Sequence, residues 1–71
     1  MRVDLLPTTW DGRLARIEEE CGETIKAIGK MHRFGRTATD PKTKIEYDNV
    51  SDLMAEIYDL RDAIDRFLGN R

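Results

Sequence analysis

The fold is decided by residues 14–28, which read Leu-Ala-Arg-Ile-Glu-Glu-Glu-Cys-Gly-Glu-Thr-Ile-Lys-Ala-Ile. Their apolar members recur every three or four positions, which is the spacing that gives an α-helix one apolar stripe. A second run with this period follows, and its apolar members are Val50, Leu53, Met54, Ile57, Leu60, Ile64 and Phe67. No segment alternates apolar and polar residues as a half-buried strand would. The sequence therefore predicts an all-α fold built on two helices.

Capping residues set the expected boundaries of one domain over residues 1–71. We expect a leader over 1–8 and a first helix over 9–34, because Thr8 or Thr9 suits an N-cap and Gly35 suits a C-cap. Residues 35–48 lack a helical period and predict a loop. The second helix is expected over 49–68, with an N-cap at Asp48 or Asn49.

Size and charge narrow the class of protein. Two helices cover only part of each other's apolar stripes, so we expect an antiparallel helical hairpin that completes a four-helix bundle as a homodimer or homotetramer. The net charge of −2 does not favour nucleic acid as a partner. Apolar runs of a few residues are far short of the roughly 20 that span a membrane, no signal peptide opens the chain, and the lone Cys21 suits a reducing compartment. These features predict a cytoplasmic protein without a membrane partner.

Two pairs of carboxylates stand out against this pattern. Glu20 and Glu23 lie three positions apart on the first helix, as Glu56 and Asp59 do on the second, and each pair shares one face of its helix. Folding the helices about residues 39 and 40 brings Glu20 opposite Asp59 and Glu23 opposite Glu56. The two pairs also lie at the same angular offset from their apolar stripes.

Four carboxylates in one place would raise each other's pKa unless a cation lay among them. Oxygen ligands without His or Cys favour Mg²⁺, or Mn²⁺, over zinc. The alternative is that all four acids simply point into water. The geometry thus predicts a metal site formed by Glu20, Glu23, Glu56 and Asp59, with that alternative open.

The run from Ile17 to Ile28, continuing to Arg33-Phe-Gly35, resembles the first helix of the MazG-like all-α nucleoside triphosphate pyrophosphohydrolases, and small phage-encoded members most of all. That family carries ExxE and then ExxD on its next core helix, which fall here on Glu20/Glu23 and Glu56/Asp59. The resemblance covers about residues 14–65. It implies that the four acids bind Mg²⁺ and that a (d)NTP is converted to the (d)NMP and pyrophosphate, in a bacterial or phage-infected host cell.

The sequence departs from the family pattern in two ways. The gap between the motifs is somewhat longer, and typical members continue into further helices that complete the bundle and contact substrate. An enzyme is therefore one expectation. The alternatives are a non-catalytic hairpin that keeps the acids and binds a nucleotide or protein, and a structural dimerisation module that needs no metal.

Four further residues are assigned roles on the enzyme hypothesis. Glu19 lies beside Glu23 on the helical wheel and is the candidate catalytic residue that positions or deprotonates the attacking water. Lys30 and Arg33 are candidates for contacting phosphate, and Trp10 for stacking on a base bound to its own or a neighbouring subunit. The alternatives are a surface acid for Glu19, a pair with Asp52 for Lys30, solvation for Arg33 and a packing anchor for Trp10.

Overall fold

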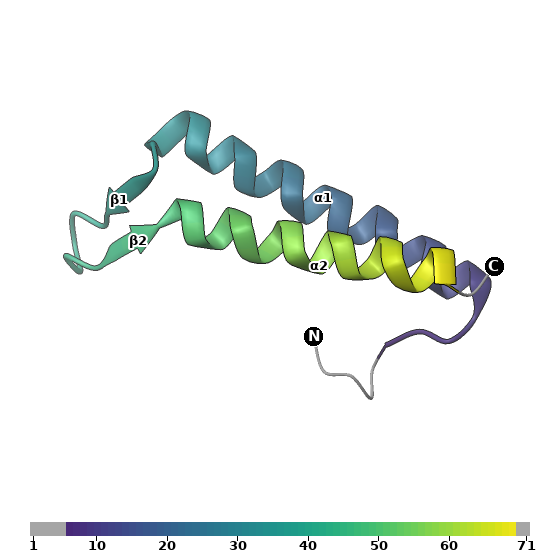
Figure 1. Cartoon of the computed structure of the whole chain (residues 1–71). Coiled ribbons are helices and arrows are strands. Elements are labelled where there is room, and N and C mark those ends of the chain that lie inside the picture. The colour runs from purple at the N-terminus through teal and green to yellow at the C-terminus, as the bar shows by residue number, and fades with distance from the viewer. Residues whose placement is uncertain (1–5, 70–71) are drawn as a thin grey trace.

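The computed structural model describes residues 6–69 and consists of two long helices joined by a small β-hairpin (Figure 1). In chain order the elements are α1 (Trp10–Phe34), β1 (Thr37–Thr39), β2 (Glu46–Asp48) and α2 (Asn49–Gly69). The helices run antiparallel and lie side by side, and the strands project from the end where α1 finishes and α2 starts. The predicted helical hairpin is confirmed.

Both ends of α1 carry the capping residues expected from the sequence. The Thr9 hydroxyl accepts a hydrogen bond from the Gly12 backbone N–H at 3.1 Å. At the other end the Gly35 N–H donates to the Met31 carbonyl, and Gly35 has a φ of 83°, a conformation that favours glycine. The helix therefore begins and ends where local chemistry satisfies its free backbone groups.

The prediction of a simple loop over 35–48 is wrong, because β1 and β2 pair in antiparallel register within it. Thr37 faces Asp48 and Thr39 faces Glu46, and β-branched threonines favour extended backbone. Asp40 stabilises the reversal: its Oδ1 accepts from the Lys42 N–H at 2.7 Å. Strands of three residues are too short to show a period of two, so the sequence pattern gave no sign of them.

Helix α2 starts from two side chains at the base of this hairpin. The Asp48 carboxylate accepts from the N–H groups of Val50 and Ser51, both at 3.1 Å, and these bonds lower the pKa of Asp48. Asn49 is buried and donates its side-chain N–H to the Gly35 carbonyl. The end of α1 is thereby tied directly to the start of α2.

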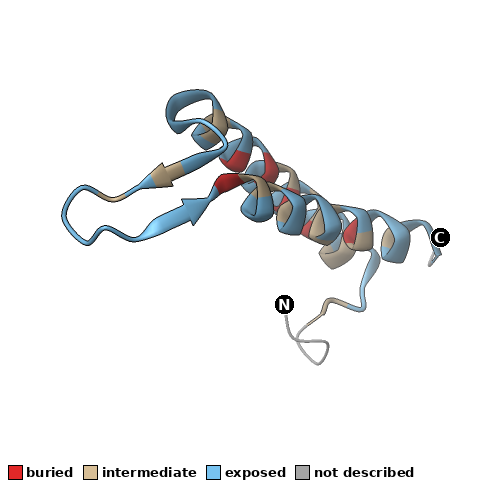
Figure 2. Cartoon of the chain, turned by 60° about the vertical axis from the view of Figure 1, so that its left-hand side comes forward, coloured by how far each residue is buried: buried red, intermediate tan, exposed pale blue. Residues whose placement is uncertain are grey.

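The buried part of the contact between α1 and α2 is made by small and polar side chains. We call it the seam, and Figure 2 shows its buried residues where the two helices face each other. Its buried members are Arg16, Glu20, Thr24, Ala27, Asn49 and Ala63. Ala63 is 1% exposed, so the helices approach closely at that point.

The apolar stripe of α1 does not form this contact, contrary to the expected core. Leu14, Ile25 and Ile28 are exposed, Ile25 by 69%, because the seam lies roughly a quarter turn of the helix away from them. The apolar stripe of α2 is rotated away from the seam in the same direction about its own helix axis, as exposed Met54 and Ile57 show. In antiparallel helices, equal displacements put both stripes on one side of the hairpin, which we call the apolar face.

This arrangement leaves the chain open and elongated. Its radius of gyration is 14.8 Å, whereas a compact chain of 71 residues would have about 11 Å. The accessible surface is 5611 Å², against about 4,500 Å² for a compact monomer of 8.2 kDa. Neither described helix is both long enough and apolar enough for a membrane crossing.

Enlarging a side chain at the tightest point of the seam tests this packing. Ala63→Leu should lower the free energy of unfolding by about 1–3 kcal/mol, because the added carbons must separate the helices. Urea unfolding followed by circular dichroism measures the change. Ala15→Leu on the exposed side of α1 is the control, and an equal loss in both variants would contradict a close-packed seam.

Candidate metal centre

Three of the four expected carboxylates meet in the seam. Glu20 from α1 and Glu56 and Asp59 from α2 each offer one oxygen, and these oxygens lie within 4.8 Å of one another. Glu20 is buried, and the other two side chains are half-buried. We call these three residues the carboxylate cluster.

The register of the helices, which we predicted from a fold about residues 39 and 40, explains this convergence. The Arg16 Nη1 donates to Asp62 Oδ2 at 2.9 Å across the seam. Two turns further along, the Thr24 hydroxyl lies 3.5 Å from the Glu56 carbonyl. Both contacts fit the predicted alignment to within one residue, and that alignment sets Glu20 facing Asp59.

The fourth acid, Glu23, lies beside the cluster and not within it. It is exposed and lines a groove of about 220 Å³ that also includes Glu56. We call this hollow the acidic groove, and its remaining lining residues are Lys26, Ala27, Lys30, Asn49, Asp52 and Ala55. Carboxylates and two lysine ammonium groups therefore share one concave surface.

Burial and neighbouring charges disfavour the ionised form of Glu20. Its pKa is raised, first by loss of hydration and next by the negative charge of Asp59. Arg16 acts in the opposite direction, and Glu56 and Glu19 add further repulsion. The fold therefore holds a buried carboxylate whose charge is only partly compensated.

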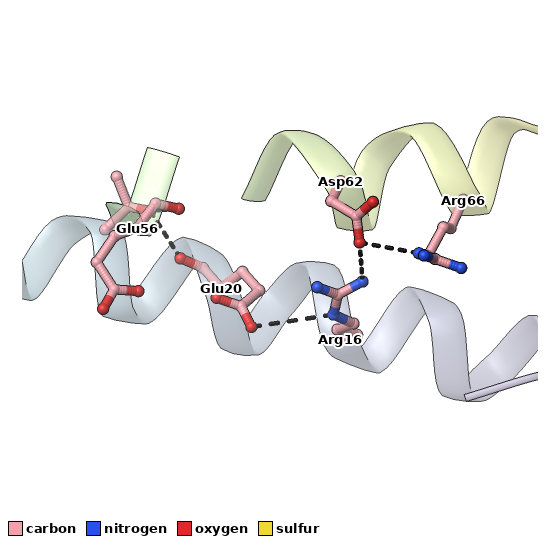
Figure 3. A network of polar contacts seen from close by, with 6 residues as sticks. Arg16, Glu20, Glu56, Asp62 and Arg66 are labelled. Carbon is pink, nitrogen blue, oxygen red and sulfur yellow. Dashed lines mark hydrogen bonds and ion pairs between the residues drawn. The ribbon is translucent and has the colours of Figure 1, made fainter. Parts of the chain in front are cut away.

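Arg16 is the site residue that the sequence analysis missed. It is 5% exposed, its Nη1 binds Asp62, and its Nε lies 4.0 Å from Glu20 Oε1 (Figure 3). That Nε is buried and has no hydrogen-bond partner among residues 6–69. Arg66 also binds Asp62, at 2.8 Å, and the two guanidinium groups lower the pKa of Asp62. The signal was available, since Arg16 lies four positions before Glu20 on the same helical face.

Of the other predicted site residues, one lines the acidic groove and the rest lie outside it. Glu19 is exposed, and Lys30 lines the acidic groove with Asp52, its alternative partner. Arg33 is exposed, with its guanidinium 5.6 Å from the centre of the Phe34 ring. Trp10 is not brought to the cluster within one chain.

Trp10 instead contacts the far end of the other helix. Its ring centre lies 5.4 Å from that of Phe67, near the C-terminal end of α2. Ten residues of helix separate Trp10 from Glu20, or about 15 Å. This position fits a packing anchor that joins the start of α1 to the end of α2.

The chemistry and spacing of the cluster suit a small hard cation. Mg²⁺ takes oxygen ligands at about 2.1 Å in octahedral geometry, which separates adjacent ligands by about 3.0 Å and opposite ligands by about 4.2 Å. The three oxygens, which lie within 4.8 Å of one another, would have to move closer together to reach that spacing. Glu20, Glu56 and Asp59 are the residues that would hold the ion, and Glu23 lines the acidic groove together with Glu56.

Comparisons of the chain with protein-family models, with curated protein sequences and with solved structures yield no match.

The raised pKa of Glu20 predicts how stability depends on pH when no metal is present. A raised folded-state pKa favours folding at low pH, and this contribution is lost as the pH rises through that pKa. Glu20→Gln should therefore raise the unfolding midpoint at pH 7 by a few °C, with about 1 kcal/mol giving roughly 4–8 °C in a domain of this size. The gain should shrink as the pH is lowered, because the raised pKa makes Glu20 protonate before an ordinary glutamate does.

Thermal unfolding in chelator-treated buffer from about pH 4 to pH 7 measures this effect. Glu18→Gln removes the same charge from an exposed position on α1 and is the matched control. A midpoint for Glu20→Gln that follows the control at every pH would contradict an electrostatic cost at Glu20.

Proposed function

We propose that this chain is a Mg²⁺-dependent nucleotide pyrophosphohydrolase that converts a (d)NTP to the (d)NMP and pyrophosphate. The observation that carries the proposal is the convergence of Glu20, Glu56 and Asp59, because Glu56 also lines a groove that contains Lys26 and Lys30. A bound cation and basic side chains together suit a polyphosphate. The resemblance of the two acidic motifs to those of MazG-like enzymes supports the same proposal. We further propose that the protein acts in the cytoplasm of a bacterium or phage-infected cell.

Each group at the site would have a separate role in the reaction. Bound Mg²⁺ would neutralise charge on the triphosphate and lower the pKa of a coordinated water. Lys26 and Lys30 would contact phosphate oxygens in the groove. Glu19 precedes Glu23 by one turn on the same side of α1, where it would accept a proton from the attacking water. Attack on the α-phosphorus forms one P–O bond, breaks the bond to the bridging oxygen and releases pyrophosphate.

Self-association is part of the proposal. The chain exposes roughly 1,000 Å² more than a compact monomer would, which is close to the 800 Å² or so that one partner buries in a standard interface. The apolar face supplies suitable side chains for that contact, among them Leu14, Ile28 and Ile57. Two hairpins joined through this face would form a four-helix bundle, as a homodimer or as half of a homotetramer, and the acidic groove would remain accessible.

A charge on the apolar face tests the association. Ile57→Asp should shift the protein from oligomer to monomer at micromolar concentration, because an unpaired carboxylate would be buried in the interface. Sedimentation velocity measures the shift. Tyr58→Asp is the control, since Tyr58 lies on the same helix away from this face and is 59% exposed. A monomeric wild-type protein would contradict the proposal.

Pyrophosphate release tests the activity. Purified protein with Mg²⁺ and a panel of (d)NTPs should release pyrophosphate, and Glu56→Gln should lower kcat/KM by at least about 100-fold, since a ligand to the ion is lost. Asp65→Asn, an exposed acid on the same helix, should retain wild-type activity. Metal-dependent nucleotide binding without any release would contradict the enzyme and favour a non-catalytic binding module. A thermal midpoint indifferent to Mg²⁺, Mn²⁺ and nucleotide would favour a structural module.

A further inference from the structure

A second hollow adjoins the acidic groove at the base of the β-hairpin. It encloses about 410 Å³, within the range of small-molecule sites, and we call it the aromatic hollow. Its apolar walls come from three elements: Phe34 ends α1, Ala38 and Tyr47 belong to the strands, and Pro41 lies in the turn. Phe34 is 60% exposed and Tyr47 46%, so both rings are accessible to a ligand.

The two hollows are adjacent. Lys30, Asn49 and Asp52 line both of them, so these three side chains lie at the boundary between the hollows. Asp52 precedes Glu56 by one turn of α2 and Phe34 follows Lys30 by one turn of α1, which places the aromatic hollow about 6 Å further along each helix. A ligand that extends across this boundary can therefore contact both hollows.

The two hollows differ in chemistry in the way that the two halves of a nucleotide differ. The acidic groove offers carboxylates and ammonium groups, which suit a metal-bound polyphosphate. The aromatic hollow offers two rings with polar side chains at its edge, among them Asp40 and Asn49. Exposed aromatic rings stack on nucleobases. A carboxylate accepts hydrogen bonds from a ribose or a base edge, and a side-chain amide can both accept and donate them.

We propose that the aromatic hollow binds the nucleoside half of the substrate, with Tyr47 and Phe34 contacting the base. This inference rests on the proposed function, because it places the triphosphate of the same ligand in the acidic groove. It replaces Trp10 as the stacking residue, since Trp10 contacts Phe67 near the opposite ends of the helices. The β-hairpin then becomes the element that selects among nucleotides.

Binding without turnover tests the proposal. The probes are inorganic tripolyphosphate and the α,β-methylene analogues of the four dNTPs, which cannot release pyrophosphate. Each is titrated into the purified protein with Mn²⁺ by calorimetry. At least one analogue should bind about tenfold or more tightly than tripolyphosphate, because only the nucleotide places a base on the rings. Tyr47→Ala should remove that difference and leave the Kd of tripolyphosphate unchanged.

Two control variants separate stacking from structural damage. Tyr47→Phe keeps the ring and should keep the preference for nucleotide, and Tyr58→Ala removes an exposed ring outside the hollow and should have no effect. Equal affinity for tripolyphosphate and every analogue, or equal weakening of all probes in Tyr47→Ala, would overturn this inference and leave the proposed function standing. Failure of both tripolyphosphate and the analogues to bind with Mn²⁺ would overturn the proposed function, and this inference with it.

Discussion

The burial of the Arg16 guanidinium in the seam is the constraint on which the rest of the structure depends. A charge that is 5% exposed is costly unless anions compensate it, and here Asp62 binds it across the seam while Glu20 lies beside it on the same helix. The bond to Asp62 fixes how far one helix can slide along the other. That alignment places Glu56 and Asp59 next to Glu20. The ion pair and the carboxylate cluster are therefore two parts of one arrangement.

Because small and polar residues form the seam, the apolar face and the acidic groove are separate surfaces of the hairpin. Ala27 and Ala63 allow the helices to approach, and polar side chains occupy the position that an apolar core would normally take. The apolar stripes are consequently turned to one side, and the acidic groove opens between the helices beside the seam. A chain with so few residues could not build an enclosed core and a charged site in the same place.

Much of this organisation could be predicted from the sequence, because it depends on local spacing. Helical periodicity predicted both helices, capping chemistry at Thr9 and Gly35 predicted the ends of α1, and matched intervals predicted that Glu20 faces Asp59. Helical periodicity could not predict which face of each helix packs against the other helix. An apolar stripe indicates where a helix avoids water, but it does not say whether its own chain or another copy provides the cover. Arg16 was missed for the same reason, since a charged residue is ordinarily assigned to the solvent.

The raised pKa of Glu20 connects the stability of the hairpin to the ligand it is proposed to bind. Glu20 faces Asp59 and Glu56 with Arg16 as its nearby cation, and that guanidinium is already bound to Asp62. The remaining repulsion opposes the packing of α1 on α2 at neutral pH. A divalent cation among the three carboxylates would remove this repulsion, so binding and folding would reinforce each other. A cation bound in this way would raise the free energy of unfolding, and it would do so most at a pH where all three carboxylates are ionised.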